Sequence, residues 1–77
     1  MEIHLKLYSV LREKLPKESN GETVIQMDEG ATLLDLLDEL DIPHKVVVSI
    51  NDIQETDKSR SLNDGDEVRL FSSVSGG

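Results

Sequence analysis

A single stripe of leucines limits most strongly what this chain can fold into. Four leucines in segment 32–43 recur at intervals of three and four residues: Leu33, Leu36, Leu37 and Leu40. This spacing predicts an amphipathic helix that buries one face. Thr32 is expected to cap its first turn, with Asp35 near the positive end of the helix, and Pro43 is expected to end it. Because so short a helix is unstable alone in water, it must pack on a sheet.

Short strand patterns lie on both sides of this helix. Five segments show alternating apolar residues or β-branched composition: 3–8, 23–27, 45–50, a short one from Ile53, and 68–71. Asn51-Asp52 predicts a two-residue hairpin turn. Segment 10–15 predicts a short helical turn stopped by Pro16, and 17–21 reads as a loop. Since one helix must cover one face of this mixed sheet, the sequence predicts an α+β roll of the β-grasp kind, with four to five strands on one main helix.

The composition narrows the class of function. At 77 residues one domain is expected, and without cysteine there is no disulfide, thiolate ligand or nucleophilic thiol. His4 and His44 stand alone, so no metal site is expected. The net charge of −8 argues against nucleic acid as a partner, because phosphate binding needs basic residues. With no apolar run of membrane-spanning length and no signal-peptide pattern, we expect a cytoplasmic protein without a membrane partner.

Acidic residues are concentrated in segment 21–41, which contains no basic residue. They are Glu22, Asp28, Glu29, Asp35, Asp38, Glu39 and Asp41. We interpret this run chiefly as a solvated surface that aids solubility, although it also suits steering of a basic partner. Acid–base catalysis needs a pocket that perturbs such carboxylates. Neither a phosphate loop nor a Ser–His–Asp signature is present, so the sequence predicts no active site of its own.

Three apolar side chains are out of phase with the buried positions of their strands: Tyr8, Val47 and Phe71. The first, third and last strands are neighbours in a β-grasp sheet, so the three are expected to meet on its open face. The basic or titratable residues expected nearby are His4, Lys6, Lys45 and Arg69. Two interpretations stay open: a partner-binding surface formed by Phe71, Tyr8, Val47 and Arg69, or ordinary scattered surface residues.

The sequence closes on Val74-Ser75-Gly76-Gly77. Two glycines form a thin segment that fits a narrow cleft where any Cβ would clash. We therefore divide the chain into a domain over 1–71 and a flexible tail over 72–77. The tail's chemistry is that of its terminal carboxylate, a poor electrophile until it is activated, for example by adenylation. Taken alone, such a pair of glycines is more often a frayed end.

Several stretches together resemble the MoaD/ThiS family of ubiquitin-like sulfur carriers, and most nearly its MoaD branch, the small subunits of molybdopterin synthase. The resemblance covers nearly the full length and rests on 3–13, 29–33, 48–51, 62–71 and 74–77. Two positions depart from the family pattern. Ser72-Ser73 replaces the usual prolines, which makes the tail less stiff, and Asn51-Asp52 replaces Asn-Gly.

The resemblance implies a carrier that is not itself an enzyme and binds no cofactor. An adenylyltransferase related to ubiquitin activators (MoeB-like) would use ATP to adenylate Gly77. A sulfur donor, such as a cysteine desulfurase or rhodanese, would then form a thiocarboxylate. Gly76, Ser75 and Val74 would enter the active site of the partner, which in the MoaD branch is the large synthase subunit (MoaE-like) that receives sulfur for molybdopterin. Three alternatives remain: sulfur transfer to thiamine or tRNA, a modifier joined to target lysines through Gly77, and an interaction domain with an inert tail.

Overall fold

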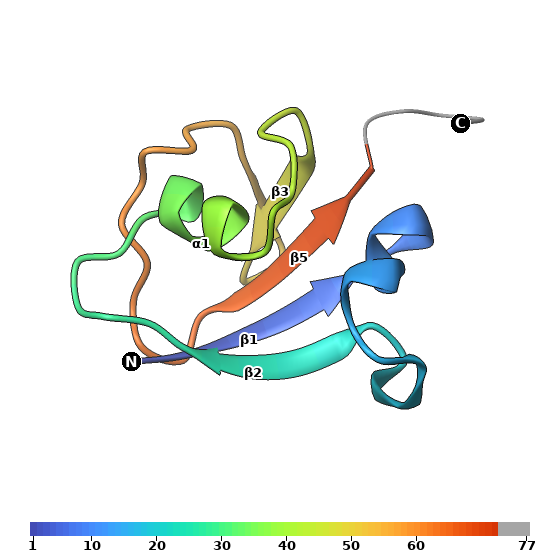
Figure 1. The fold of residues 1–77 in the computed structure, drawn as a ribbon. Coiled ribbons are helices and arrows are strands. Elements are labelled where there is room, and N and C mark those ends of the chain that lie inside the picture. Colours follow the sequence, from blue (N-terminus) through green and yellow to red (C-terminus); the bar gives the residue numbers. More distant parts are fainter. Residues whose placement is uncertain (73–77) are drawn as a thin grey trace.

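The computed structural model describes residues 1–72, and their elements follow the predicted order (Figure 1). In chain order they are β1 (Glu2–Leu7), the 3-10 helices η1 (Ser9–Lys14) and η2 (Lys17–Ser19), β2 (Glu22–Gln26), α1 (Leu33–Glu39), β3 (Val47–Ile50), β4 (Ile53–Glu55) and β5 (Glu67–Phe71). The prediction of four to five strands on one main helix is confirmed, with five strands in the sheet.

The strands form one mixed sheet in the order β2-β1-β5-β3-β4. The first strand, β1, runs parallel to the last, β5, and the three other pairings are antiparallel. The central position therefore belongs to β5, which lies between β1 and β3. This arrangement, with a helix across one face, is the predicted β-grasp roll.

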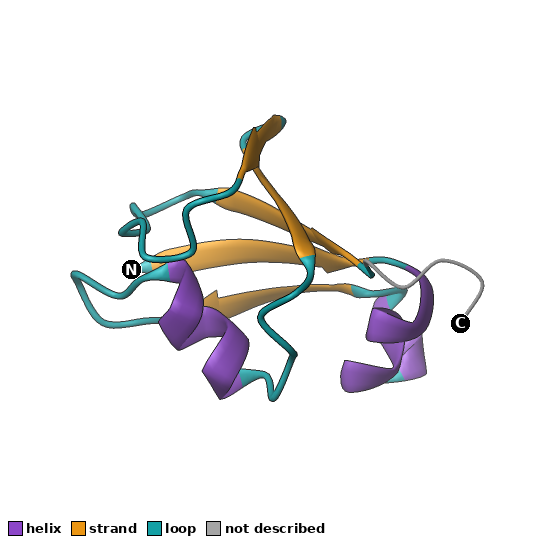
Figure 2. Ribbon diagram, turned by 90° about the horizontal axis from the view of Figure 1, so that it is seen from above, coloured by secondary structure: helices purple, strands orange, loops and turns teal. Residues whose placement is uncertain are grey.

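The helix α1 and the 3-10 helices η1 and η2 lie on the same side of the sheet, as Figure 2 shows. The apolar side chains between them and the sheet are buried: Ile3, Leu5, Leu7, Leu11, Leu33, Leu36, Leu37, Ile42, Val46, Val48, Ile50, Leu62, Val68 and Leu70. Leu40, the fourth leucine of the stripe, is only partly buried against this core. The alternation along each strand thus divides the sheet into a core face and an open face.

The helix begins as expected. The Thr32 hydroxyl accepts a hydrogen bond from the backbone N–H of Asp35 at 3.3 Å, and the Asp35 carboxylate accepts one from the N–H of Thr32 at 2.9 Å. This reciprocal pair is a capping box, which satisfies two backbone donors that the first turn leaves without partners.

The prediction that Pro43 ends the helix is wrong. The last helical residue is Glu39, and the chain turns at Asp41, which adopts a left-handed conformation with φ of 56°. The N–H of Ile42 then donates to the carbonyl of Leu37 at 2.9 Å, and that of Asp41 to Asp38 at 3.2 Å. These bonds form a Schellman motif, normally built on glycine, and they end the helix before the proline is reached.

Two further boundaries differ slightly from expectation. The third strand begins at Val47 rather than residue 45, although Val46 is buried, and segment 17–21 contains the short helix η2. The hairpin turn is confirmed, because Asn51 and Asp52 both have positive φ, 52° and 70°. Two consecutive left-handed residues are typical of the turn that best matches strand twist.

Candidate functional site

An aromatic pair lies on the open face, at the end of β5 that leads into the predicted tail. The rings of Tyr8 and Phe71 stack with their centroids 4.4 Å apart and their planes 16° from parallel. Val47 lies opposite Phe71 on β3 and leaves 38% of its surface exposed. The expectation that these three residues meet is confirmed, and we call them the apolar cluster.

The backbone holds Tyr8 in place. Its N–H donates to the carbonyl of Leu70 at 3.1 Å, which continues the pairing of β1 with β5 by one residue. The next residue, Ser9, has a φ of 54°, so the chain turns sharply there into η1. A left-handed conformation is uncommon for serine. Tyr8 is therefore fixed on its face by strand pairing on one side and a tight turn on the other.

Two basic side chains adjoin the apolar cluster on neighbouring strands. Lys6 and Arg69 are register partners between β1 and β5. The Lys6 ammonium lies 5.3 Å from the centre of the Tyr8 ring, a distance at which cation and ring attract. The other two residues expected nearby lie further out: His4 is exposed, 4.0 Å from the Glu2 carboxylate, and Lys45 is exposed just before β3.

Arg69 is engaged by an acidic residue that sequence reasoning missed. Its Nη1 donates to Asp52 Oδ1 at 2.6 Å, although 38% of the Arg69 side chain and 77% of that of Asp52 remain exposed. Asp52 belongs to the hairpin turn, and β3 brings that turn beside β5 by pairing Ser49 with Arg69. The turn was predictable, but the ion pair depends on a strand register that the sequence does not show.

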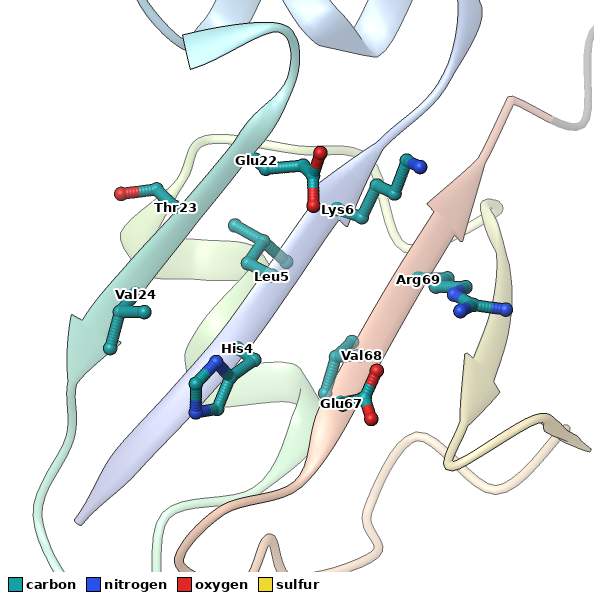
Figure 3. A pocket seen from close by; sticks show the side chains of 9 residues that line it. All are labelled: His4, Leu5, Lys6, Glu22, Thr23, Val24, Glu67, Val68 and Arg69. Atoms are coloured by element: carbon teal, nitrogen blue, oxygen red, sulfur yellow. The ribbon is translucent and has the colours of Figure 1, made fainter.

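The open face is hollowed between β2 and β5, as Figure 3 shows. A hollow of about 300 Å³ lies over β1, and its charged or titratable lining residues are His4, Lys6, Glu22, Glu67 and Arg69. Both signs of charge are present in this lining, whereas sites for small molecules are lined mostly by apolar side chains. Within residues 1–72, no group of three acidic or histidine side chains is placed to hold a metal ion. The geometry therefore suits contact with a macromolecular surface better than enclosure of a small substrate.

A buried carboxylate supports the base of β5, and the sequence did not indicate it. Asp66 is 6% exposed and accepts hydrogen bonds from the Asn51 side-chain amide at 3.0 Å and from the N–H of Asn63 at 2.9 Å. The Asn51 carbonyl oxygen in turn accepts from the N–H of Glu67 at 3.0 Å. These bonds tie the hairpin turn to the strand that carries Arg69 and Phe71.

One carboxyl group outside this region has a perturbed acidity. Hydrogen bonds from the side chain and backbone of Ser59, at 2.5 Å and 3.0 Å, lower the pKa of Asp57 below its ordinary value. Asp57 is exposed in the loop that follows β4, and its hydrogen bonds are to a residue of the same loop. The bonds therefore shape the loop rather than prepare a reactive group.

The predicted reacting residues lie outside the described part of the chain. This applies to Gly77, Gly76, Ser75 and Val74, whose expected roles stay predictions. The structure does place the point from which they follow, because Phe71 is the last residue of β5. Among the helices of residues 1–72, none combines the length and apolar character that crossing a bilayer requires.

Comparisons with known proteins support the fold and identify the family. Residues 5–77 match the model of the ThiS family. Small archaeal modifier protein 1 of H. volcanii is 21% identical with a TM-score of 0.74, over 95% of this chain and 98% of that one. A putative molybdopterin converting factor subunit 1 from Pyrococcus furiosus is 21% identical with a TM-score of 0.75, over 96% and 99%.

A third solved structure is a protein–protein complex. Subunits 1 and 2 of the molybdopterin-converting factor from Helicobacter pylori form it, and the matched chain is 20% identical with a TM-score of 0.64, over 100% of both chains. At these identities the solved structures establish the β-grasp, ubiquitin-like fold. The sequence matches no curated protein with significant similarity.

Proposed function

Because this chain belongs to the ThiS family, we propose that it is a sulfur carrier whose Gly77 carboxylate is activated by adenylation and converted to a thiocarboxylate. A ubiquitin-activator-like enzyme joins the carboxylate to AMP and releases pyrophosphate from ATP. The persulfide of a sulfur donor, such as a cysteine desulfurase or rhodanese, then attacks the acyl carbon and displaces AMP. A second thiol cleaves the resulting acyl disulfide, which releases the thiocarboxylate and leaves a disulfide on the donor side. The carrier supplies the reacting terminus and a docking surface, and its partners supply the active sites.

The observation that carries this proposal is the extent of the family match, which runs from β1 through Gly76-Gly77. The hollows described within residues 1–72 suit surface contact better than catalysis, and the stacked rings of Tyr8 and Phe71 lie at the end of β5 that leads toward the tail. We propose that the apolar cluster and Arg69 form the surface that partners contact while the tail enters their active site. Such a surface, fixed before binding, reduces the ordering cost of association.

For the pathway, we propose delivery of sulfur to molybdopterin. The Pyrococcus and Helicobacter proteins are described as subunits of a molybdopterin-converting factor, and the Helicobacter subunit is seen with a second subunit. A large synthase subunit is therefore the proposed acceptor for this chain. Genetic complementation of a strain that lacks the small synthase subunit tests this point. Restored molybdenum-cofactor synthesis in that strain supports the proposal. A strain that expresses this chain and still makes no cofactor contradicts it.

The activation chemistry is tested by pyrophosphate exchange with the adenylyltransferase from the same organism. We expect exchange with the wild-type chain and none after deletion of Gly77, because the deletion displaces the carboxylate by about 3.5 Å and misplacement of about 1 Å costs orders of magnitude in rate. Gly76→Val is expected to act similarly by filling a channel shaped for glycine. Glu39→Gln, on the exposed helix face, is the control and keeps full exchange.

A second candidate is a protein modifier, favoured by the structural similarity to small archaeal modifier protein 1. Both functions begin with the same acyl-adenylate, so the exchange assay does not separate them. Intact mass does. After incubation with the activating enzyme, ATP and a sulfur donor, a mass gain matching replacement of one oxygen by sulfur marks the carrier. Lysine-linked adducts recovered from cells mark the modifier.

A further inference from the structure

The hollow beside α1 and the open face differ in the charges that they present. On the side of α1, a shallow hollow is lined by acidic residues and by no basic one; the acidic residues are Asp28, Glu29, Asp35, Asp38 and Glu39. On the open face, Lys6 and Arg69 lie side by side next to the apolar cluster. In a chain with a net charge of −8, the open face is thus where two cations meet exposed apolar surface.

The guanidinium of Arg69 is already occupied in the free protein. Asp52 holds it at 2.6 Å from the hairpin turn, and both side chains remain in contact with solvent. Exposed ion pairs of this kind contribute little to stability, because water and salt screen them. A carboxylate from another protein can therefore replace Asp52 at small cost, and the contact it forms is stronger once water is excluded.

We infer that the open face binds a protein surface that presents a carboxylate beside an apolar side chain, and that Asp52 competes with this carboxylate for Arg69. The inference rests on the proposed function, since the activating enzyme is the occupant. Its apolar side chain packs on the Tyr8–Phe71 stack, while its carboxylate takes the guanidinium and gains from Lys6 nearby. Arg69 then determines which partner surface is bound. Competition from Asp52 lowers the binding affinity, so that the carrier can also dissociate from its partner.

A second copy of this chain is a poor occupant. Each copy carries the net charge of −8. An interface formed by the same face of both copies would also bring each basic pair against its equivalent. Sedimentation analysis of the wild-type chain checks this point. A monomer is expected, and a dimer that dissociates on Arg69→Gln substitution would overturn the assignment.

The test compares two substitutions that remove the same charge from similar residues. Asp52 and Asp41 are both exposed, both have a left-handed backbone conformation, and both form an ion pair with a basic side chain. The partner of Asp41 is Lys14, on the helix side of the sheet. Asparagine tolerates the left-handed conformation, so Asp52→Asn and Asp41→Asn keep the backbone. With the activating enzyme and ATP as probe, we expect calorimetry to show affinity raised about two- to fivefold by Asp52→Asn and unchanged by Asp41→Asn.

The double variant separates direct competition from a general change of charge. Arg69→Gln is expected to lower affinity about five- to tenfold and to weaken its salt dependence between about 0.1 M and 1 M, where the Debye length falls from about 10 Å to about 3 Å. In this background Asp52→Asn is expected to have no further effect. Reduced affinity of Asp52→Asn alone would overturn competition and show that Asp52 instead orients Arg69.

Pyrophosphate exchange keeps the two proposals distinguishable. If Asp52→Asn, Asp41→Asn and Arg69→Gln all support exchange with the apparent affinity of the wild-type chain, the assignment of Arg69 and Asp52 is overturned. The sulfur-carrier function is unaffected by that result. Absence of exchange by the wild-type chain overturns both proposals together.

Discussion

The two faces of the sheet are built from alternate residues of the same strands, yet they serve different ends. On the core face, Leu5 and Leu70 lie under the helices and are almost fully buried. On the open face, Lys6 and Arg69 sit one residue away from them in the chain and keep contact with water. The apolar cluster is where large apolar side chains come together on that open face.

The difference shows that each face has its own energetic role. The core face supplies the apolar burial that a domain of this size needs in order to fold. The open face adds little to stability, since its contacts are exposed stacking and ion pairs. The identities of its residues can therefore be set by partner binding instead of by stability. If this division is correct, substitutions on the two faces should separate stability from binding.

The largest effect is expected from Leu37→Ala in the core. Leu37 has 0% exposure, so truncation leaves a cavity and costs about 2–5 kcal/mol of unfolding free energy. Val47→Ala on the open face is the control and should cost less than about 1 kcal/mol. Urea denaturation followed by circular dichroism measures both. Equal midpoints for the two variants would contradict the division between the faces.

A smaller loss is expected from Asp66→Ala, which tests the buried link below β5. Removal of this carboxylate leaves the donors of Asn51 and Asn63 without their partner and costs about 1–3 kcal/mol. Asp64→Ala removes the same charge from the same turn. Because Asp64 only accepts a bond from the exposed N–H of Glu2 at 2.7 Å, water can replace it. Denaturation curves that rank Asp64→Ala as the more damaging change would refute this account.

Phe71→Ala tests the open face, where a substitution is expected to affect binding more than stability. Loss of the stack with Tyr8 is expected to lower stability by only about 0.5–1.5 kcal/mol, while affinity for the activating enzyme falls at least about tenfold. Val47→Asp should weaken binding in the same way. Val10→Ala, at an exposed position of η1 outside the hollow and the apolar cluster, is the control for both assays. Wild-type affinity in calorimetry would remove the apolar cluster from the binding surface, and a collapsed fold would place it in the core.

The smallest effect concerns pH. Hydrogen bonds from Ser59 lower the pKa of Asp57 in the folded state below the ordinary value of 3.8. The ionised form is therefore favoured by folding, and its contribution is present above the ordinary pKa and lost as pH falls through the lowered one. Thermal midpoints of wild type and Asp57→Asn should differ slightly at pH 7 and converge as the pH falls below about 4. A gap that widens on acidification would reverse the sign.

Much of the architecture was predictable because the determinants are local. The alternation in β1, the leucine stripe and the Thr32–Asp35 cap each specify an element within a few residues. The helix end was missed because Asp41 is a weak signal for a left-handed residue, whereas Pro43 is a strong signal for a stop. Sequence reasoning located the apolar cluster through strand phase. It missed the Asp52–Arg69 pair and the burial of Asp66, since both depend on how distant strands align.

The parallel pairing of β1 with β5 bears on how the molecule resists mechanical force. Four residue pairs join these strands, from His4 with Glu67 to Leu7 with Leu70, and β5 is held by β3 on its other edge. Figure 1 shows β1 and β5 side by side and pointing the same way, so tension between the start of β1 and the end of β5 acts along both strands. Such a pull must slide β5 past both neighbours and strain many backbone hydrogen bonds together, instead of opening them in sequence. We therefore expect the domain to withstand traction on its C-terminal side better than traction that peels off an edge strand such as β2.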